Sequence, residues 1–350
     1  MRTGPGRNTA ISLCKGENMK KKRLILLCFI ILINLLSLPV FGEGAGELQT
    51  EYKPLVIKAA ALKGPSGIGM IHLFEEPPES DENVAFSFSV ASSPDILVSQ
   101  ILKKEVDIAS LPLNVAANLY TKGTDYILGA VTGYGLLYCV TSRDDISSIR
   151  DLAGKTVYSV GKGATPEYVF AFLLEQEGLV PGQDCIINYS MNQIELTKIL
   201  IAGKRDTALL PEPFVTMVLK GNTDFSIALD LQKEWQRHFN QQGSYPMTCV
   251  VIRKGLYGEQ PGGVGDFLSG YKKSIQWVQK NPGEAEALTE KYNLGMPADI
   301  AASVIPRLNL TFLPAREARA EVEIFLKVLF NFAPKSIGGA LPDGGFYGQE

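Results

Sequence analysis

The chain has 350 residues, of which 45% are hydrophobic and 20% charged, so it can bury a substantial core in one or two domains. Its 34 Lys and Arg residues are outnumbered by 37 Asp and Glu residues. No basic surface is therefore expected to follow a phosphate backbone, which argues against nucleic acid as a partner.

The three cysteines beyond residue 42 are Cys139, Cys185 and Cys249, which are far apart and odd in number. This spacing predicts neither a disulfide framework nor a paired metal site. We expect each of them to be a small core residue.

The N-terminal region has the pattern of a secretory signal peptide. Basic residues at positions 20–23 precede an apolar run at 24–33, and Val40 and Gly42 suit a cleavage site. We therefore expect residues 1–42 to be removed, with Met19 as a candidate true start and Ala45 as a second cleavage position. Removal would leave 27 Lys and Arg against 36 Asp and Glu, a net charge of −9. The alternative is an uncleaved anchor, for which the run is barely long enough.

A Gly-rich turn follows the first expected strand, at residues 55–62. The turn, Lys63 to Met70, contains three glycines, a proline and a serine, and it leads into an apolar run with helical spacing. Such a turn exposes N–H groups at a helix N-terminus, where Ser66 and Gly67 can hold a polar or anionic group. The alternative is a plain connection with Ser66 as N-cap.

Strand and helix patterns then alternate up to residue 141. The expected elements are strands at 84–90, 106–109, 126–131 and 136–141 and helices at 95–105 and from Asn114 onward. The first of these helices should bury Ile96, Leu97, Ile101 and Leu102. A Gly-flanked break before residue 136 contains Tyr134. The alternation predicts βαβ units and a mostly parallel sheet.

The opening pattern returns in the second half of the chain. A strand ending at Val160 leads into Gly161 to Glu167, where Gly163 is followed by Thr165 and Pro166 at a helix start. The later expected elements are a strand–helix unit at 185–202, a strand at 207–210 before Glu212, a polar segment at 235–244, a strand at 247–252 and helices from 264 onward. Two α/β halves with Gly-rich turns predict two lobes whose turns face each other across a cleft, where ligands of open α/β sheets bind.

Five motifs recur together in one known family. They are Leu62 to Gly69, Asp107-Ile108-Ala109 before an Asn-containing helix start, Gly161 to Glu167, Pro211-Glu212-Pro213, and Ile337-Gly338-Gly339 with Leu341-Pro342-Asp343. In this order they resemble the solute-binding proteins of ABC importers, in the branch related to nitrate, sulfonate, taurine and thiamine-precursor binders. The resemblance extends over about residues 55 to 347.

The resemblance implies a two-lobed type II periplasmic-binding fold of the α/β class, each lobe a mostly parallel sheet flanked by helices. Lobe 1 would comprise residues 43–135 and 246–350, with the C-terminal helices, and lobe 2 residues 136–245. Crossover strands near 134–140 and 244–250 would join them. The resemblance also implies a monomer in the periplasm or another extracytoplasmic space, which touches the membrane only through an importer permease or an uncleaved signal.

The candidate ligand-binding residues are Ser66, Gly67, Asn114, Tyr134, Gly163, Thr165 and Glu212. Hydroxyl and amide groups at helix starts can grip a carboxylate, sulfonate or carbonyl, or they can cap their helices. Glu212, between two prolines, can bind an amine or a heterocycle N–H, or it can be a solvated loop carboxylate. Tyr134 can stack on a flat ligand or pack between the lobes. No arginine is among these residues, which weakens the case for a sulfonate.

Catalytic and cofactor patterns fail in this sequence. Gly154-Lys155-Thr156 lacks the earlier glycine of a P-loop, and no G-x-S-x-G elbow is present. His72 and His238 have no carboxylate or cysteine at metal-ligand spacing. We therefore expect no metal, no cofactor and no enzyme.

The function expected from these residues is the capture of a small organic molecule, a heterocycle or a sulfonate-like or nitrate-like anion, and its delivery to an ABC importer. One alternative is an enzyme that resembles the thiamine-pyrimidine synthases of the same fold family. The signal peptide and the scarcity of histidine argue against that enzyme. The other alternative is a ligand-sensing partner of a membrane receptor.

Overall fold

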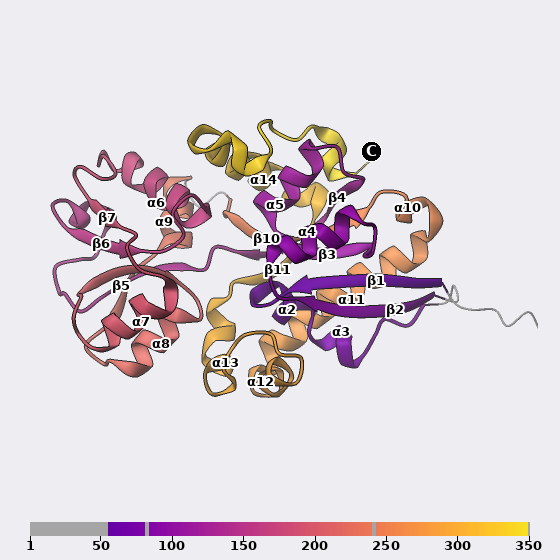
Figure 1. Cartoon of the computed structure of the whole chain (residues 1–350), viewed down its shortest axis with the longest axis horizontal. Helices are drawn as coiled ribbons and strands as arrows, with labels where there is room; N and C mark the ends of the chain where they lie inside the picture. Colours follow the sequence, from indigo (N-terminus) through magenta and orange to yellow (C-terminus); the bar gives the residue numbers. More distant parts are fainter. Residues whose placement is uncertain (1–54, 81–83, 240–242, 349–350) are drawn as a thin grey trace, which may run out of the picture. The chain divides into compact units, whose positions relative to one another are not determined.

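The computed structural model describes residues 55–80, 84–239 and 243–348 (Figure 1). The expected signal peptide and the polar residues up to position 54 lie outside the described residues. Among the described helices, none is both long and apolar enough to cross a membrane.

The first sheet has six strands in the order β11-β4-β10-β3-β1-β2. Its strands are β1 (Leu55–Leu62), β2 (Val84–Ala91), β3 (Ile108–Pro112), β4 (Tyr126–Tyr134), β10 (Pro246–Arg253) and β11 (Leu310–Pro314). β1 pairs in parallel with β2 and β3, whereas β10 is antiparallel to β3 and β4, and β11 is antiparallel to β4. Strands β1 to β4 therefore run in one direction and β10 and β11 in the other.

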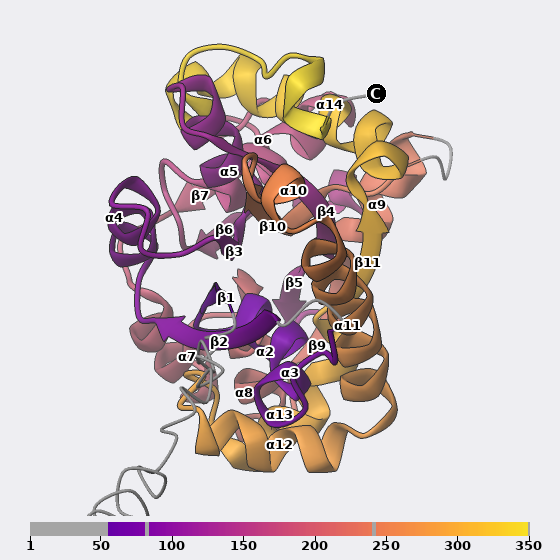
Figure 2. The same cartoon turned by 90° about the vertical axis from the view of Figure 1, so that its right-hand side faces the viewer.

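Helices cover both faces of this sheet (Figure 2). On one face lie α4 (Pro94–Leu102), α5 (Leu113–Thr121) and α14 (Ala315–Phe332), whose apolar residues join the largest buried cluster. On the other face lie α2 (Pro65–Met70), α3 (His72–Glu75), α11 (Pro261–Lys280), α12 (Pro282–Lys291) and α13 (Ala298–Val304), around a second cluster. β1 supplies residues to both clusters because its side chains alternate between the two faces.

The second sheet has five strands in the order β7-β6-β8-β5-β9. They are β5 (Leu137–Thr141), β6 (Thr156–Ser159), β7 (Ile186–Asn188), β8 (Thr207–Pro211) and β9 (Ser226–Asp230). β6 is parallel to β7 and β8, and β5 is antiparallel to β8 and β9, so four of the five strands share one direction.

Helices also flank the second sheet on both faces. Buried residues of α6 (Thr165–Gln176) and α9 (Leu231–His238) belong to the same large cluster as α14, and Tyr168 stacks on Phe332 with ring centroids 6.5 Å apart. α7 (Gln193–Ile201) and α8 (Phe214–Gly221) cover the other face with a third cluster. The remaining short elements are η1 (Ile149–Leu152), α10 (Leu256–Glu259), η2 (Ile305–Arg307), η3 (Pro334–Ile337) and η4 (Gly344–Tyr347).

Three local features differ from expectation. The segment expected to be polar at 235–244 is polar, but it begins inside α9, where Trp235 is only 1% exposed because the apolar residues of the helix lie on one face. β9 and β11 were not expected, since both are short strands that only their neighbours in the sheets reveal. In α4, Ile96 and Leu102 are exposed, because the helix contacts the sheet through the narrower stripe of Leu97 and Ile101.

The expected fold class is confirmed. Both sheets are mixed in strand direction, each with a majority running one way, and helices flank each sheet. β1 is parallel to β2 and β3, and β6 is parallel to β7 and β8, as βαβ units require.

Candidate functional site

The candidate residues lie at the carboxyl ends of parallel strands. In the first sheet, α2 with Ser66 follows β1 and α5 with Asn114 follows β3, and these two strands are neighbours. In the second sheet, the turn before Thr165 follows β6 and Glu212 follows β8, and these strands are also neighbours. Each sheet therefore carries two of the predicted residues side by side on one edge, the edge where α/β proteins bind ligands.

The chain itself links these two edges. β4 ends at Tyr134 on the carboxyl edge of the first sheet, and only Gly135 and Leu136 separate it from β5. β5 begins opposite Pro211, the last residue of β8, which is on the carboxyl edge of the second sheet. A second connection returns to Pro246, the first residue of β10, which pairs with Tyr134. The two carboxyl edges are thus joined by two short crossovers.

Ser66 and Gly67 are buried in α2 and pack against the sheet. The N-cap is Gly64, with φ 88°, so the alternative with Ser66 as N-cap is wrong. A Cβ on Gly67 would lie 2.8 Å from the Leu62 carbonyl oxygen and 2.7 Å from Leu294 Cδ2, so packing requires glycine there. The Ser66 carbonyl accepts a hydrogen bond of 3.2 Å from the Tyr271 hydroxyl. α2 has only six residues, which limits the dipole that it can present to an anion.

Asn114 is the second residue of α5 and is partly exposed. The helix has Pro112 at its N-cap position and no side-chain cap. The alternative in which Asn114 caps α5 is therefore wrong, and its amide remains a candidate donor and acceptor for a ligand.

Gly163 and Thr165 form the start of α6. Gly163 has φ +75° and donates its N–H to Glu167 Oε2 at 2.5 Å, so a carboxylate of the same helix already occupies this donor. Thr165 is 9% exposed and lies directly after the N-cap residue Ala164, with no side-chain cap. α6 has 12 residues, so its N-terminus has a fuller dipole than that of α2.

The surroundings of Glu212 differ most from those expected from the sequence. Its side chain is fully buried and forms an ion pair with Arg307 of η2. Its oxygens also accept hydrogen bonds from the Thr216 N–H at 3.1 Å and the Thr216 hydroxyl at 3.0 Å, and Arg307 donates to that hydroxyl as well. The alternative of a solvated loop carboxylate is therefore wrong.

Arg307 was missed because no motif surrounds it in the sequence. η2 lies beside the first crossover, since the Asn309 carbonyl accepts from Tyr134 N–H at 3.0 Å and the Asn309 amide donates to Gly135 O. The Arg307 carbonyl also accepts from the Tyr138 hydroxyl at 3.0 Å. An arginine thus lies next to one of the predicted residues, and the objection that no arginine is near the site no longer holds.

Tyr134 is anchored at the crossovers. Its hydroxyl donates to Glu321 Oε2 of α14 at 2.9 Å, and the other oxygen of Glu321 accepts from Ser244 N–H at 3.2 Å. Burial, together with the Glu321 carboxylate, raises the pKa of Tyr134 well above its usual value. Glu321 therefore connects both crossovers. Gln232 of α9 does the same from the second sheet, because its Oε1 accepts from the N–H groups of Gly135 and Tyr245, each at 3.3 Å.

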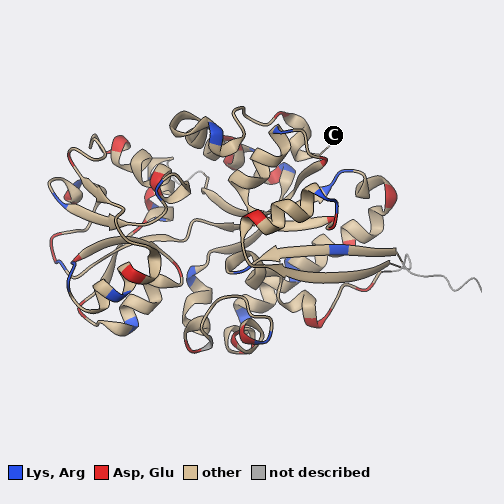
Figure 3. Ribbon diagram, in the orientation of Figure 1, with Lys and Arg blue, Asp and Glu red and all other residues tan. Residues whose placement is uncertain are grey.

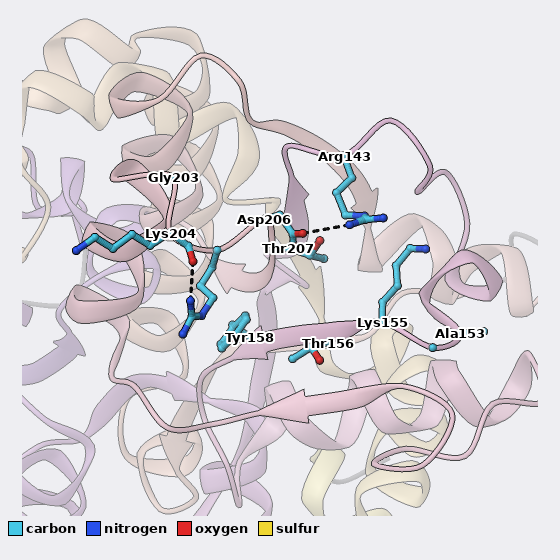
Figure 4. A pocket seen from close by; sticks show the side chains of 11 residues that line it. Arg143, Ala153, Lys155, Thr156, Tyr158, Gly203, Lys204, Asp206 and Thr207 are labelled. Atoms are coloured by element: carbon cyan, nitrogen blue, oxygen red, sulfur yellow. Dashed lines mark hydrogen bonds and ion pairs between the residues drawn. The ribbon is translucent and has the colours of Figure 1, made fainter.

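A polar pocket of about 580 Å³ lies at the amino ends of β6 and β8, away from the predicted residues (Figure 4). Arg143 there forms ion pairs with Asp145 at 2.8 Å and Asp206 at 3.2 Å, and Lys155 pairs with Asp145 at 3.1 Å. The two acids and two bases of this network neutralise one another, while Lys204 and Arg205 also line the pocket and make its lining basic.

The two histidines considered as catalytic or metal-binding residues pack against aromatic rings. His72 packs on Trp277 with ring centroids 4.2 Å apart, and His238 packs edge-on against Phe172. The expectation that no carboxylate lies at a suitable spacing from His72 was wrong, because Glu76, four residues on, places Oε1 3.8 Å from His72 Nε2. Within the described ranges, no group of three His, Cys, Asp or Glu side chains could hold a metal.

Known proteins share this architecture. Residues 134–285 match the family model described as NMT1/THI5 like. The crystal structure of an ABC transporter protein from Parabacteroides distasonis is similar with 29% identity and a TM-score of 0.72, over 84% of this chain and 99% of that chain. The fold is that of the periplasmic solute-binding proteins.

Two further structures show the same fold at lower identity. The periplasmic aliphatic sulphonate binding protein SsuA of Escherichia coli is 15% identical with a TM-score of 0.62, over 83% of this chain and 94% of that one. The ligand binding component of an ABC-type import system from Staphylococcus aureus is 14% identical with a TM-score of 0.57, over 85% and 99%. No curated protein matches the chain by sequence. The resemblance to this periplasmic-binding family is confirmed.

Proposed function

We propose that the chain is an extracytoplasmic solute-binding protein that captures a small organic molecule and delivers it to the permease of an ABC importer. Similar proteins are described as an ABC transporter, a periplasmic aliphatic sulphonate binding protein and the ligand binding component of an ABC-type import system. The mechanism is capture by closure of two lobes, with boundaries at residues 135/136 and 245/246, about the two crossovers.

One observation carries this proposal. Two sheets present the carboxyl edges of their parallel strands to the same pair of crossovers, and the Glu212–Arg307 ion pair connects the second sheet to η2 beside the first. A ligand held at both edges would contact both lobes at once, so binding would favour the closed arrangement.

The ligand-binding residues in this proposal are Ser66, Gly67, Asn114, Tyr134, Gly163, Thr165 and Glu212, with Arg307 added. Thr165 and Asn114 are the better-supported ligand-binding residues, because neither α5 nor α6 has a side-chain cap at its N-terminus. To bind a ligand, Glu212 would have to release Arg307, and the Gly163 N–H would have to release Glu167. Tyr134 hydrogen-bonds to Glu321 at the crossovers.

Two ligand classes fit this site: a heterocycle, including thiamine precursors, and a sulfonate-like or nitrate-like anion. Arg307 can donate to a sulfonate or nitrate oxygen, and Glu212 can accept from a heterocycle N–H. Because these two groups are paired with each other, the site presents a donor and an acceptor together and does not favour a strongly charged ligand on charge alone.

We propose binding without turnover and without a cofactor. The runner-up is an enzyme like the thiamine-pyrimidine synthases, for which the family description NMT1/THI5 like is the specific observation. Such an enzyme would need a lysine and a histidine at its site. Both described histidines pack against aromatic rings, which supports a binding role. A sensing partner of a membrane receptor would use the same capture step.

A thermal-shift screen tests the proposal. The panel comprises thiamine precursors, flavins, nucleobases, sulfonates and nitrate, with purified protein at neutral pH. A ligand at about a hundred times its Kd should stabilise the protein by about 2.7 kcal/mol. The absence of any shift across the panel would reject the proposed ligand classes, and an absorbance band of a lysine-bound pyridoxal cofactor would favour the enzyme.

A pair of threonine variants tests the location of the site. Thr165 follows β6 at its carboxyl end, whereas Thr156 is exposed at the amino end of the same strand. Thr165→Leu should abolish the ligand-induced shift, and Thr156→Leu should leave it unchanged. Equal shifts in the two variants would remove the start of α6 from the site.

A further inference from the structure

In the described part of the chain, the outer edge of β2 is an unpaired strand edge. β2 ends the six-stranded sheet, and within the described residues it pairs only with β1, through eight consecutive residue pairs in regular register. Among residues 55–80, 84–239 and 243–348, no other strand pairs with it. Figure 1 shows β2 at the margin of the sheet next to β1.

The composition of β2 does not protect this edge. Its sequence from Val84 to Ala91 contains no charged residue, no proline and no glycine, and Figure 3 shows the strand without acidic or basic colour. Soluble proteins usually guard edge strands with charges, prolines, bulges or short length, because an open ladder of N–H and C=O groups recruits another strand. Valine and phenylalanine also favour strand pairing. The edge is therefore built to accept a strand.

The sequence of the strand selects its partner. From Val84 to Val90 it reads almost the same in both directions about Ser87. Two copies aligned antiparallel about Ser87 would place Phe86 of one copy opposite Phe88 of the other, and Val84 opposite Val90. Aromatic and β-branched cross-strand pairs of this kind stabilise antiparallel ladders.

We propose that two copies of this chain associate through antiparallel pairing of their β2 strands, centred on Ser87. The contact is isologous, so the same residues serve both copies and the association stops at a pair. It departs from the expectation of a monomer, while each copy keeps its own complete ligand-binding unit. The proposal does not depend on the identity of the ligand.

The register centred on Ser87 pairs the outward backbone N–H and C=O groups whether the odd-numbered or the even-numbered residues of β2 direct them outward. Alternate residues of an edge strand direct both of their backbone polar groups outward. If the odd-numbered residues point outward, Ser87 exchanges two hydrogen bonds with its own copy. If the even-numbered residues do, Phe86 and Phe88 of opposite copies exchange them. In both cases the same residues face each other.

A hollow beside the edge would be covered by this pairing. It has a volume of about 540 Å³ and an aromatic wall that includes Phe74, Phe86, Phe88 and Tyr292. Phe74 stacks on Phe88 with ring centroids 5.2 Å apart, and Phe86 lies 6.3 Å from Phe88. Both strand phenylalanines are only partly buried, so Phe86 of the second copy would extend this row beside Phe88.

Charge placed at the centre of symmetry tests the proposal. Ser87 is exposed, so Ser87→Lys and Ser87→Glu should fold normally, as circular dichroism and thermal melting would check. In analytical ultracentrifugation the natural protein should dimerise with a Kd between about 10 μM and 1 mM, since a single strand edge buries less area than a standard interface. Each variant alone should dimerise at least about tenfold more weakly, because like charges oppose each other across the pair.

Mixing the two variants supplies the decisive measurement. Only in the register centred on Ser87 does the introduced lysine of one copy face the introduced glutamate of the other, so the mixture should dimerise at least as well as the natural protein. Ser226→Lys, which puts the same charge at the start of the edge strand of the second sheet, should not alter dimerisation. A natural protein that stays monomeric up to about 1 mM, or a dimer that neither variant weakens, would overturn the proposal. Failure of the mixture to recover would overturn the register.

Discussion

Glu212 and Arg307 are 95 residues apart in the sequence and form an ion pair in which the side chain of Glu212 is fully buried and that of Arg307 is 31% exposed. Glu212 directly follows β8 of the second sheet, and Arg307 is the last residue of η2, which precedes β11 of the first sheet. The pair therefore joins segments of the two sheets near the crossovers, and removing either charge should have unequal effects.

Arg307→Ala should lower the free energy of unfolding by about 2–4 kcal/mol, because it leaves a buried carboxylate without its cation. Glu212→Gln should cost less, since an amide oxygen can still accept from Thr216 while Arg307 reaches solvent. Urea unfolding of both variants and of the double variant would measure the coupling. If the double variant is as unstable as the sum of the two single variants, the ion pair contributes nothing to stability.

Glu321 should restrain the two crossovers. Glu321→Ala removes the acceptor of the Tyr134 hydroxyl and of Ser244 N–H, and we expect a loss of about 1–3 kcal/mol and faster amide exchange in residues 133–136 and 244–247. Glu323→Ala is the matched control on the same helix, because Glu323 pairs with Arg319 at an exposed position. Equal exchange rates in the two variants would show that Glu321 does not restrain the crossovers.

Gly67→Ala should destabilise the protein by about 1–3 kcal/mol, because the new methyl group would meet the Leu62 carbonyl and Leu294 within 2.8 Å. Gly265→Ala in α11 is the control, since among the described residues no atom beyond its chain neighbours and the backbone of its own helix lies within 4 Å of its added Cβ. This second variant should gain about 0.5–1 kcal/mol from helix propensity and a more restricted unfolded chain. Thermal melting of both would check the contrast, and a stable Gly67→Ala protein would contradict the close packing.

Asp151 should contribute to stability at neutral pH and lose this contribution in acid. Hydrogen bonds from the N–H and hydroxyl groups of Ser147 and Ser148 lower its pKa from 3.8 to about 2. Because the folded-state pKa is the lower one, the stabilisation is complete above the ordinary value and disappears as the pH falls through about 2. Urea unfolding should therefore separate natural protein from Asp151→Asn at pH 7, and the two should converge near pH 2. A constant difference would refute the linkage.

Cys139, Cys185 and Cys249 should resist alkylation in the native protein. Burial raises the pKa of the Cys139 thiol to about 12 and that of Cys185 to about 11, and it raises that of Cys249 further. At pH 8 almost no thiolate forms, and none of the three is exposed. Mass mapping after iodoacetamide treatment should find these three unmodified until denaturant is added. Rapid native labelling of any of them would show local opening.

The sequence by itself determined the fold class and the position of the strand-to-helix turns. Period-two and helical apolar patterns, with Gly64, Gly163 and the prolines that follow them, fix local backbone geometry without help from distant residues. The order of these turns was enough to indicate two sheets and their ligand-binding edges.

Only the tertiary structure decided the partners of the polar side chains. Arg307 reaches Glu212, Glu321 reaches Tyr134, and Gln232 reaches both crossovers through contacts between residues far apart in the chain. No local pattern encodes such pairings, because they depend on how the sheets and helices pack. The same holds for the short strands β9 and β11, which exist through their neighbours, whereas the open edge of β2 became visible only once the strand order was known.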